Sequence, residues 1–310
     1  MDSNQRKPAG GIDRRGFLKC MQWAGTGLLW TISGGIPKSA LLGQTAQPPD
    51  GFSFVQISDS HIGFDRPANA NVMQTLQVAI DQINSLAQQP DFVIHTGDLS
   101  HGARAQQFDD LEQALKTLRA RQVFYVPGEH DLVDDDRKLY LERFGKDAAG
   151  TGWYSFDHNG VHFIALNNCM QVDGLGQLGD SQLAWMQNDL AGRSASTPIV
   201  VFAHIPLWAL YPRWGWATAD GERALDLLKR FGSVTVLNGH IHQVMQKVEG
   251  NVAFHTAAST AFPQPAPGEA KAPGPMTVPA DRLRSVLGIT KVAFVPGRNH
   301  LAVVDQSLSA

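Results

Sequence analysis

The stretch Val126-Pro127-Gly128-Glu129-His130-Asp131 decides how the rest of the chain is organised. It follows an apolar run at 122–126, which indicates a buried strand, and Pro127-Gly128 ends that strand. Three ionisable residues therefore stand at the carboxyl end of a strand, where open α/β sheets gather their ligands. This stretch predicts one wall of a ligand site.

Four other apolar runs, at 54–57, 92–96, 199–203 and 234–237, end in the same way. They lead to Asp59 and His61, to Asp98, to His204, and to His240 and His242. One such strand end would be weak support for a site. Five of them along one chain predict a single site that is assembled across a sheet.

Composition excludes several classes of protein. The 310 residues are 43% hydrophobic, which suits one large domain or two small ones. The net charge is −3 and no basic run is present, which argues against a nucleic-acid-binding surface. Cys20 and Cys169 are the two cysteines, so no disulfide framework is possible once the first is cleaved away. No cysteine cluster or haem motif favours a redox protein.

Residues 1–46 resemble a twin-arginine export signal. The pair Arg14-Arg15 lies in 13–19, an uncharged run at 20–36 follows, and small residues at 43–46 offer a cleavage site. The resemblance implies the twin-arginine machinery as a partner, a periplasmic location, and membrane contact only through this segment. The alternatives are a chance Arg pair ahead of a buried helix, and an uncleaved membrane anchor, because the run is near the lower length limit for a span.

Strands and helices alternate after the Pro-rich joint at 47–49. Strands are predicted at 52–58, 92–96, 122–126, 198–203 and 233–237, and helices at 69–88, 105–120, 137–144, 180–191 and 221–231. A hairpin is predicted from 153–156 and 161–166, and strand-like pieces at 244–248 and 252–257. The first three strands and their helices fit parallel βαβ units, and the later hairpins favour a mixed second sheet.

The end of the chain is less regular. Residues 262–279 are rich in Pro, Gly and Ala and predict an irregular surface loop, which we interpret as a lid over the site. A short helix at about 280–287 and two weak strands follow. We expect one catalytic domain at 47–261, with 262–310 as an extension that packs on the same domain.

The strand ends carry a metal-binding pattern. Strand periodicity turns Asp59 and His61 to one side, and His240 and His242 repeat this spacing. The candidate metal ligands are Asp59, His61, Asp98, Glu129, His204, His240 and His242. Their mixture of carboxylate and imidazole suits zinc, iron or manganese more than calcium or magnesium. Seven ligands exceed one tetrahedral site, so we expect two ions that share a bridging carboxylate.

The remaining histidines are weaker candidates. His95, His162 and His255 lie inside apolar strands, which favours structural roles, and His158 falls on the hairpin surface. His101 lies in the loop after Asp98, and either a surface position or a position facing substrate fits the sequence.

Two further groups have open alternatives. Trp208, Tyr211, Trp214 and Trp216 follow His204 and form either a substrate wall or a small hydrophobic cluster under their loop. Arg66 and Arg213 are either phosphate contacts or plain surface residues.

The motifs together resemble those of the calcineurin-like metallophosphoesterase family. They are, in order, Asp59-x-His61, Gly97-Asp98, Gly128-x-His130-Asp131, His204 and Gly239-His240-x-His242, over about residues 52–260. The resemblance implies an α/β fold of two packed mixed β-sheets flanked by helices, a four-layer αββα sandwich, with two metals at one edge.

The resemblance also implies a role for each motif residue. Asp59, His61 and His242 would hold the first metal, Asp98 would bridge, and Glu129, His204 and His240 would hold the second. A two-metal-activated hydroxide would attack a small-molecule phosphate ester. His130 would be the catalytic group beside the metals, oriented by Asp131. A phosphodiester of the cyclic-nucleotide type is the first expectation, because the compact motif spacing resembles that subgroup, and a phosphomonoester is the second.

The chain departs from the family pattern at Glu129, where the family normally has Asn. Glu offers an anion on a longer side chain, so we expect tighter binding of the second metal and weaker Lewis acidity. A metal-dependent binding or sensory protein with reduced catalysis is the alternative. The segment Leu99-Ser100-His101 also lacks the metal-binding Tyr of purple acid phosphatases, so we expect no purple colour.

Overall fold

The structure is a computed structural model that describes residues 28–33, 36–41, 51–133, 137–145, 148, 150–170, 174–296 and 301–309. The chain divides into two compact units, Met1–Pro49 and Asp50–Ala310. In the first unit, β1 (Leu28–Ser33) pairs antiparallel with β2 (Ile36–Leu41). The predicted twin-arginine pattern at 13–19 and cleavage site at 43–46 lie outside the described residues. Within the described part of the chain, no helix is long and apolar enough to cross a membrane.

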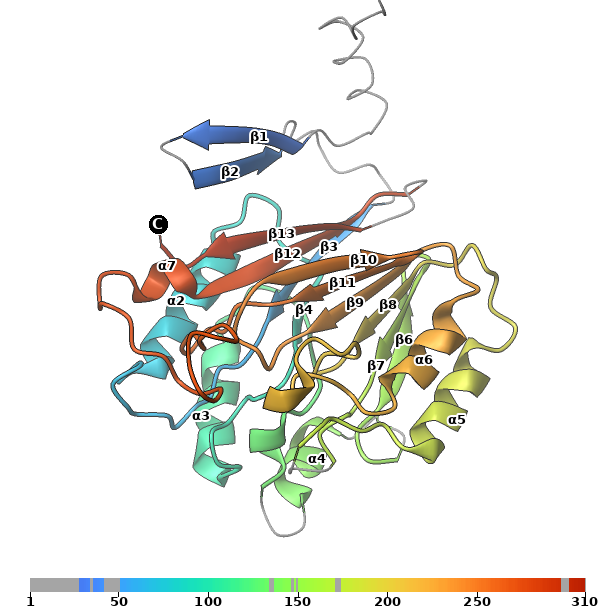
Figure 1. The fold of residues 1–310 in the computed structure, drawn as a ribbon, viewed down its shortest axis with the longest axis horizontal. Coiled ribbons are helices and arrows are strands. Elements are labelled where there is room, and N and C mark those ends of the chain that lie inside the picture. The colour runs from blue at the N-terminus through green and yellow to red at the C-terminus, as the bar shows by residue number, and fades with distance from the viewer. Residues whose placement is uncertain are drawn as a thin grey trace, which may run out of the picture. The chain divides into compact units, whose positions relative to one another are not determined.

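The second unit is built on two mixed β-sheets (Figure 1). The five-stranded sheet has the order β13-β12-β3-β4-β5 and the six-stranded sheet the order β10-β11-β9-β8-β7-β6. The first contains β3 (Phe52–Ile57), β4 (Phe92–His95), β5 (Val123–Tyr125), β12 (Gly288–Phe294) and β13 (Ala302–Ser307). The second contains β6 (Tyr154–His158), β7 (Val161–Ala165), β8 (Ile199–Phe202), β9 (Val234–Asn238), β10 (Met245–Glu249) and β11 (Val252–Thr256).

Parallel strands form the middle of each sheet. Strands β3, β4 and β5 are parallel, as the predicted βαβ units require, and β7, β8, β9 and β11 are parallel in the other sheet. Antiparallel strands flank them: β12 beside β3, and β6 and β10 at the edges of the six-stranded sheet. Because parallel strands share a direction, the loops after them gather at one edge of the double sheet.

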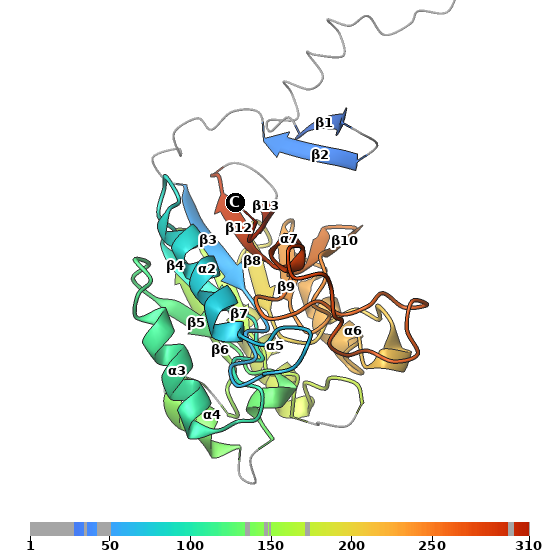
Figure 2. The ribbon, with the colours of Figure 1, turned by 90° about the vertical axis from the view of Figure 1, so that its left-hand side faces the viewer.

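Helices cover both outer faces of the double sheet. Figures 1 and 2 show α2 (Val72–Asn84) and α3 (Ala105–Leu115) on the side of the five-stranded sheet, and α5 (Asp180–Leu190) and α6 (Gly221–Leu228) on the other. The short helices are α4 (Lys138–Phe144), α7 (Leu283–Val286), η1 (Glu129–Asp131) and η2 (Pro212–Trp214). Helix α2 begins later than predicted because Asn71 caps it, its side chain accepting a hydrogen bond from the backbone N–H of Gln74 (3.1 Å).

Three hydrophobic clusters correspond to the contacts between the layers. One joins α2 and α3 to the five-stranded sheet, and another joins α5 and α6 to the six-stranded sheet. The third lies between the sheets, where Phe54 stacks on Phe92 (centroids 5.1 Å apart) and meets Phe163 edge-on (5.5 Å). Each fully buried Phe side chain stabilises the fold by about 1.5–3 kcal/mol. The predicted four-layer αββα sandwich is confirmed.

The C-terminal strands are more central than their weak sequence signal suggests. Strand β12 pairs antiparallel with β3, the strand that leads to Asp59, and places Phe294 opposite Phe52. Strand β13 then pairs with β12 at the sheet edge. The segment after residue 287 is therefore part of the sheet that supports the site.

Candidate metal centre

Backbone hydrogen bonds join the loops that follow the parallel strands. The N–H groups of Asp59 and His61 donate to the carbonyls of Gly97 (3.0 Å) and Asp98 (2.9 Å), which connects the loops after β3 and β4. In the other sheet, the N–H of Gly239 donates to the carbonyl of His204 (2.9 Å), which connects the loops after β9 and β8. The loop positions are thus set by the backbone as well as by the side chains.

The candidate ligands occupy unusual backbone conformations. Positive φ angles between 42° and 69° occur at Asp59, His61, Asp98, His240 and His242. Such angles are uncommon outside glycine and cost free energy, so surrounding contacts must impose them. Neighbouring glycines leave the required space: a Cβ on Gly128 would collide with Asp98, and a Cβ on Gly239 would collide with Asp59.

Asp59, His61 and His242 form one group of converging side chains, the first subsite. The Nε2 atom of His242 lies 3.2 Å from Asp59 Oδ1 and 3.2 Å from His61 Nε2. All three residues are buried. One carboxylate and two imidazoles therefore offer their donor atoms around one point.

Glu129, His204 and His240 form a second group, the second subsite. The carboxylate of Glu129 reaches both imidazoles, with Oε2 at 3.0 Å from His204 Nε2 and Oε1 at 3.0 Å from His240 Nδ1. Glu129 thus lies between the two histidines, with one carboxylate oxygen facing each imidazole.

Asp98 lies between the two subsites. Its Oδ2 atom is 3.4 Å from His61 Nε2 and 3.5 Å from His204 Nε2, so one oxygen faces both groups. Its other oxygen accepts a hydrogen bond from the backbone N–H of His130 (3.0 Å). All seven predicted ligands therefore come together, with Asp98 between the two groups.

Two carboxylates of the cluster favour the ionised form although they are buried. Burial by itself would raise the pKa of Asp59, but His242 and His204 lower it to about 2. Burial likewise opposes the ionisation of Glu129, yet His240 and His204 hold its pKa well below the usual range. Burial and the neighbouring imidazoles of His242 and His130 lower the pKa of His61 well below its usual value. Anionic carboxylates and a neutral imidazole are the forms that bind metal.

Unsatisfied atoms show that the residues present fit a metal. Glu129 Oε2, His204 Nε2 and His240 Nδ1 are buried, and no hydrogen bond of acceptable geometry satisfies them. In two of the candidate ligands, His204 and His242, the other ring nitrogen has a backbone partner. Nδ1 of His204 donates to the Thr96 carbonyl (2.7 Å), and Nδ1 of His242 donates to the Phe262 carbonyl (2.6 Å). These bonds leave Nε2 free toward the cluster, which is the usual arrangement of ligating histidines.

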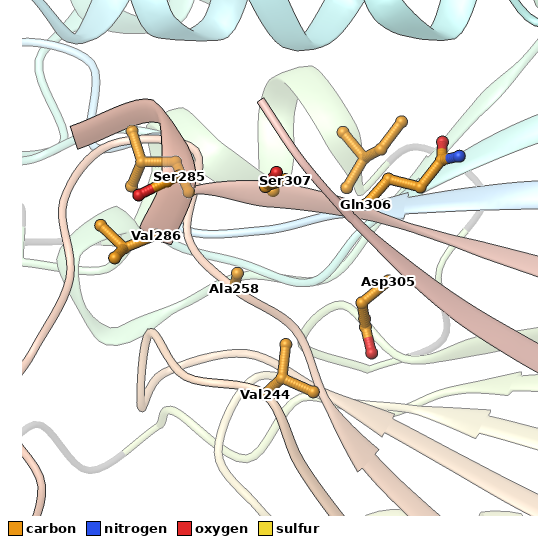
Figure 3. A pocket seen from close by; sticks show the side chains of 10 residues that line it. Val244, Ala258, Ser285, Val286, Asp305, Gln306 and Ser307 are labelled. Atoms are coloured by element: carbon orange, nitrogen blue, oxygen red, sulfur yellow. The ribbon is translucent and has the colours of Figure 1, made fainter. Parts of the chain in front are cut away.

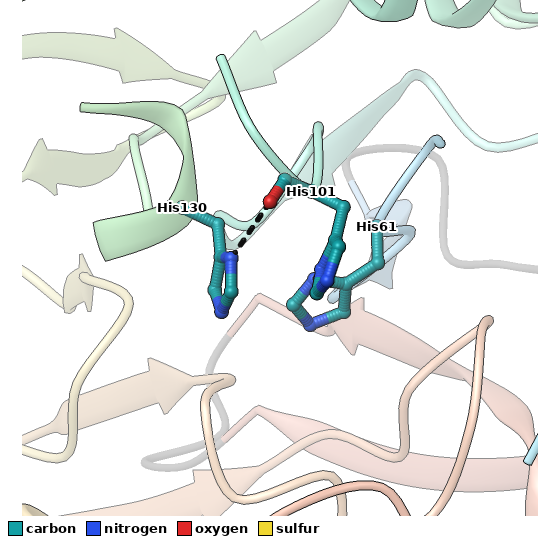
Figure 4. Close-up of side chains that lie close together, drawn as sticks. All are labelled: His61, His101 and His130. Carbon is teal, nitrogen blue, oxygen red and sulfur yellow. Dashed lines mark hydrogen bonds between the residues drawn. The ribbon is translucent and has the colours of Figure 1, made fainter. Parts of the chain in front are cut away.

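His130 lies beside the cluster, with His101 stacked against it (Figure 4). The Nδ1 of His130 donates to the His101 carbonyl (3.0 Å), and the two rings stack at 4.6 Å with an angle of 17°. Burial opposes the charged form of His130, but Asp98 and Glu129 raise its pKa above the ordinary value. His101 therefore contacts both His130 and the ligand candidate His61, and a position facing substrate stays a prediction.

The expected role of Asp131 is corrected by the structure. Its carboxylate does not meet the imidazole of His130, whose Nδ1 bonds to the His101 carbonyl instead. Asp131 accepts hydrogen bonds from the N–H groups of Leu99 (3.0 Å), Ser100 (2.8 Å) and Gly128 (3.0 Å). Its neighbours in sequence are thereby tied to the loop after β4. Burial and the charge of Asp98 raise the pKa of Asp131 to about 7.

Several supporting groups carried no sequence signal. The ring of Phe262 stacks on His61 (4.8 Å, 24°) while its carbonyl holds His242. Gln264 Nε2 donates to the His240 carbonyl (3.0 Å), and Ser259 Oγ donates to the Asp59 carbonyl (2.8 Å). The start of the predicted lid therefore packs against the ligands. Carbonyl acceptors are invisible in a sequence, because every residue has one.

The other sequence candidates have different surroundings. Trp208 is buried in a hydrophobic cluster and packs on Phe254, so the hydrophobic-cluster interpretation is confirmed for this residue. Trp216 is also buried, and its ring meets that of Trp214 edge-on. Arg66 and Arg213 are exposed.

The three strand histidines have structural partners. His95 contacts Ser60 Oγ (2.8 Å), His162 lies between Asp157 (2.9 Å) and Asp189 (2.6 Å), and His255 contacts Asp305 (3.0 Å).

A separate cavity of about 190 Å³ lies near the C-terminal strands (Figure 3). Val244, Ala258, Val286 and Asp305 are among its lining residues. None of the candidate metal ligands lines it, so its residues offer no metal-binding chemistry of the kind described above.

Comparisons with known proteins agree with this geometry. The sequence profile of the calcineurin-like phosphoesterases matches residues 52–244. A serine/threonine-protein phosphatase of Danio rerio is 28% identical over 218 residues, 62% of this chain and 70% of the relative. A 3′,5′-cyclic-nucleotide phosphodiesterase of Nostoc sp. is 24% identical over 217 residues, 68% and 79% of the two chains. A solved dimetal phosphatase from Danio rerio superposes with a TM-score of 0.62 at 13% identity, covering 83% of this chain and 96% of that one.

Proposed function

Since this chain belongs to the calcineurin-like phosphoesterase family and is a hydrolase of phosphate esters, we propose that it cleaves small phosphodiesters of the cyclic-nucleotide type at a two-metal centre. One observation carries the proposal. Asp98 Oδ2 stands 3.4 Å from His61 Nε2 and 3.5 Å from His204 Nε2, between two groups of one carboxylate and two imidazoles each. Two ions sharing a carboxylate fit this arrangement better than one.

The donor set suggests which residues hold which ion. Asp59, His61 and His242 would hold the first ion, and Glu129, His204 and His240 would hold the second. Asp98 would bridge them. The mixture of carboxylate and imidazole favours iron, manganese or zinc. When bound, two such ions supply Lewis acidity toward the phosphoryl oxygens and lower the pKa of water, which provides the nucleophile.

His130 is placed to donate or accept a proton at the candidate metal centre. Its Nδ1 is occupied by the His101 carbonyl, which leaves Nε2 as the available atom. Ligand atoms of Asp98, Glu129 and His130 lie within 4.8 Å of one another, so the imidazole borders the bridging region. In its protonated form it can stabilise charge on the phosphoryl group or protonate the leaving oxygen.

Glu129 supports a diester over a monoester. Two divalent ions with three carboxylates leave the centre a net charge of about +1, one unit less than an Asn at this position would leave. A phosphodiester carries one negative charge and a phosphomonoester dianion carries two, so the reduced charge penalises the monoester more. The Nostoc relative, a cyclic-nucleotide phosphodiesterase, supports the same class.

The binding or sensory alternative finds no support. Glu129 lies at 3.0 Å from both His204 and His240 and so takes part in the second subsite. The relatives reported above are named as a phosphatase and a phosphodiesterase.

The direct test is a substrate comparison. The full chain is loaded with manganese, iron or zinc and assayed on a bis-aryl phosphate, a mono-aryl phosphate and a 3′,5′-cyclic nucleotide. We expect kcat/KM to be higher for both diesters than for the monoester. A higher kcat/KM for the monoester would show a phosphomonoesterase, and no turnover with any metal would overturn the proposed function.

We also propose that the first 46 residues direct export through the twin-arginine route. The support is the order of features in 1–46: a paired Arg14-Arg15, an uncharged run, and small residues before Gln47. Replacing both arginines by lysine should keep the protein in the cytoplasm of a host that has this route. Unchanged recovery in the periplasm would contradict the proposal.

A further inference from the structure

We propose that His101 is a positioning residue that fixes two groups of the centre at once, the imidazole of His61 and the imidazole of His130. The inference rests on the proposed metal centre, and it concerns a residue outside the seven candidate ligands. The loop that contains Asp98 would then have a second role, because His101 in the same loop would orient His61 and His130.

The first observation concerns the ring of His61. Its Nε2 faces the first subsite, 3.4 Å from Asp98 Oδ2 and 3.2 Å from His242 Nε2. Its Nδ1 lies 3.2 Å from Nδ1 of His101. The matching nitrogens of His204 and His242 donate to backbone carbonyls, whereas His61 meets a side chain. A substitution of His101 can therefore remove the Nδ1 partner of His61, whereas a side-chain substitution leaves the carbonyl partners of His204 and His242 in place.

The tautomers follow from this contact. His61 must present a lone pair on Nε2 to bind a metal, so its proton lies on Nδ1. His101 Nδ1 then accepts that N–H, and the proton of His101 lies on Nε2. Such a hydrogen bond fixes both the tautomer and the rotation of a ligating imidazole.

The second observation concerns His130. Its Nδ1 donates to the carbonyl of His101 (3.0 Å), and its ring stacks on the His101 ring at 4.6 Å. Figure 4 shows the three histidines together, with the dashed bond running from His130 to the His101 backbone. His101 thus touches His61 with its imidazole and His130 with both its carbonyl and its ring face.

His101 is itself held firmly enough to act in this way. Its backbone N–H donates to the Ile62 carbonyl (2.9 Å), and Phe64 meets its ring edge-on at 5.1 Å. The next residue, Gly102, donates its N–H to Gln107 Oε1 (3.0 Å) on helix α3. The loop is therefore anchored on both the strand side and the helix side.

The test compares His101→Ala and His101→Asn with the wild type in the full chain. Each protein is stripped of metal and titrated with Co²⁺ by calorimetry and by its visible absorption spectrum. We expect His101→Ala to weaken binding at the first subsite by about 10–100-fold, as loss of an outer partner of a ligating histidine does. Binding at the second subsite should be unchanged. His101→Asn should recover part of the loss, because its Oδ1 can accept the His61 N–H.

The matched control is a histidine substitution outside the metal centre. His158→Ala removes a histidine that pairs with Asp91 away from the centre, and it should leave both affinities and the spectrum unchanged. Wild-type affinities and an unaltered Co²⁺ spectrum in His101→Ala would overturn the proposal, as would a third Co²⁺ equivalent that is lost with His101. If the wild type binds two ions but hydrolyses no diester, the proposed function fails while the role of His101 stands.

Discussion

The two subsites contain the same kinds of donor but differ in how they are enclosed. In the first, the side chains of Asp59, His61 and His242 are at most 2% exposed. In the second, His204 is fully buried, while Glu129 and His240 are 22% and 14% exposed. Metal held by buried and fixed ligands is harder to lose than metal held near solvent. We therefore expect a tightly bound first ion and an exchangeable second ion, with substrate entering beside the second.

Removing the shared carboxylate should have the largest effect, because it damages both subsites together. In Asp98→Ala we expect hydrolysis to fall below the activity left by any other single ligand substitution. Metal content should drop from two equivalents to one or fewer, as measured by elemental analysis. Two bound equivalents and near wild-type turnover in this variant would show that Asp98 is not a bridge.

His130→Ala should separate catalysis from metal binding. The loss of a proton-transfer group costs about 10²–10⁴-fold in rate. We expect a fall of that size in kcat with the metal content unchanged. Loss of one metal equivalent would instead make His130 a ligand.

The rate should also depend on pH through His130. Asp98 and Glu129 raise the pKa of His130 against the effect of burial, so its charged form is present at low pH and is lost as pH rises through that raised pKa. In the wild type, kcat should therefore decline on the alkaline side, and in His130→Ala that decline should disappear. An identical alkaline limb in both proteins would assign it to another group.

Glu129→Gln should sharpen the difference between the subsites. The amide keeps the length of the side chain but removes the charge that lies 3.0 Å from both His204 and His240. Loss of a residue that hydrogen-bonds to a metal ligand weakens metal binding roughly 10–100-fold. Loss of a charged ligand should cost more, so we expect the affinity for the second ion to fall by a larger factor, while the affinity for the first ion stays unchanged. Calorimetric titration of the stripped protein measures both steps. A weakened first step would contradict the assignment of Glu129 to the second subsite.

Much of the fold was predictable because its signals are local. The strands that end before Asp59, Asp98 and His204 are apolar runs followed by polar residues, and each lies within a residue or two of its predicted bounds. The position of β12 was not predictable. Its pairing with β3 joins residues about 240 positions apart, and strand pairing of that range leaves no periodic pattern in the sequence.

The centre was predictable in its ligands and less so in its supports. Side chains such as Asp98 and His242 are chemically distinctive, so their types and order pointed to one site. The bonds that fix them are made by the carbonyls of Thr96, Phe262 and His101, which every sequence contains. The family resemblance implied that Asp131 orients His130, but η1 turns the Asp131 carboxylate to the loop after β4.

Chelation should lower the stability of the whole domain moderately. An ion present at 100 times its Kd stabilises the native state by about 2.7 kcal/mol. For a domain of this size, that corresponds to a fall in Tm of roughly 5–10 °C when the ion is removed. Differential scanning calorimetry with and without chelator measures it. Equal Tm values would indicate that the centre holds no metal under the conditions used.

The smallest effect is expected at a buried histidine that lies outside the candidate metal centre. His162 lies between Asp157 and Asp189 on the six-stranded sheet. Burial opposes ionisation of Asp189, but bonds from His162 and Ser155 lower its pKa below the usual value. The resulting stability is present above the unfolded pKa and is lost as pH falls through the folded pKa. Asp189→Asn should therefore flatten the acid limb of unfolding curves slightly, and metal addition should not alter that limb.

Anomalous X-ray diffraction on crystals of the metal-loaded protein, collected at the absorption edge of the bound metal, tests the two-ion centre most directly. We expect two peaks, one enclosed by Asp59, His61 and His242 and the other by Glu129, His204 and His240, with Asp98 between them. Occupancy should be higher at the first, more buried position. A single peak, or no peak within this cluster, would contradict the two-metal centre on which the proposed phosphodiesterase chemistry depends.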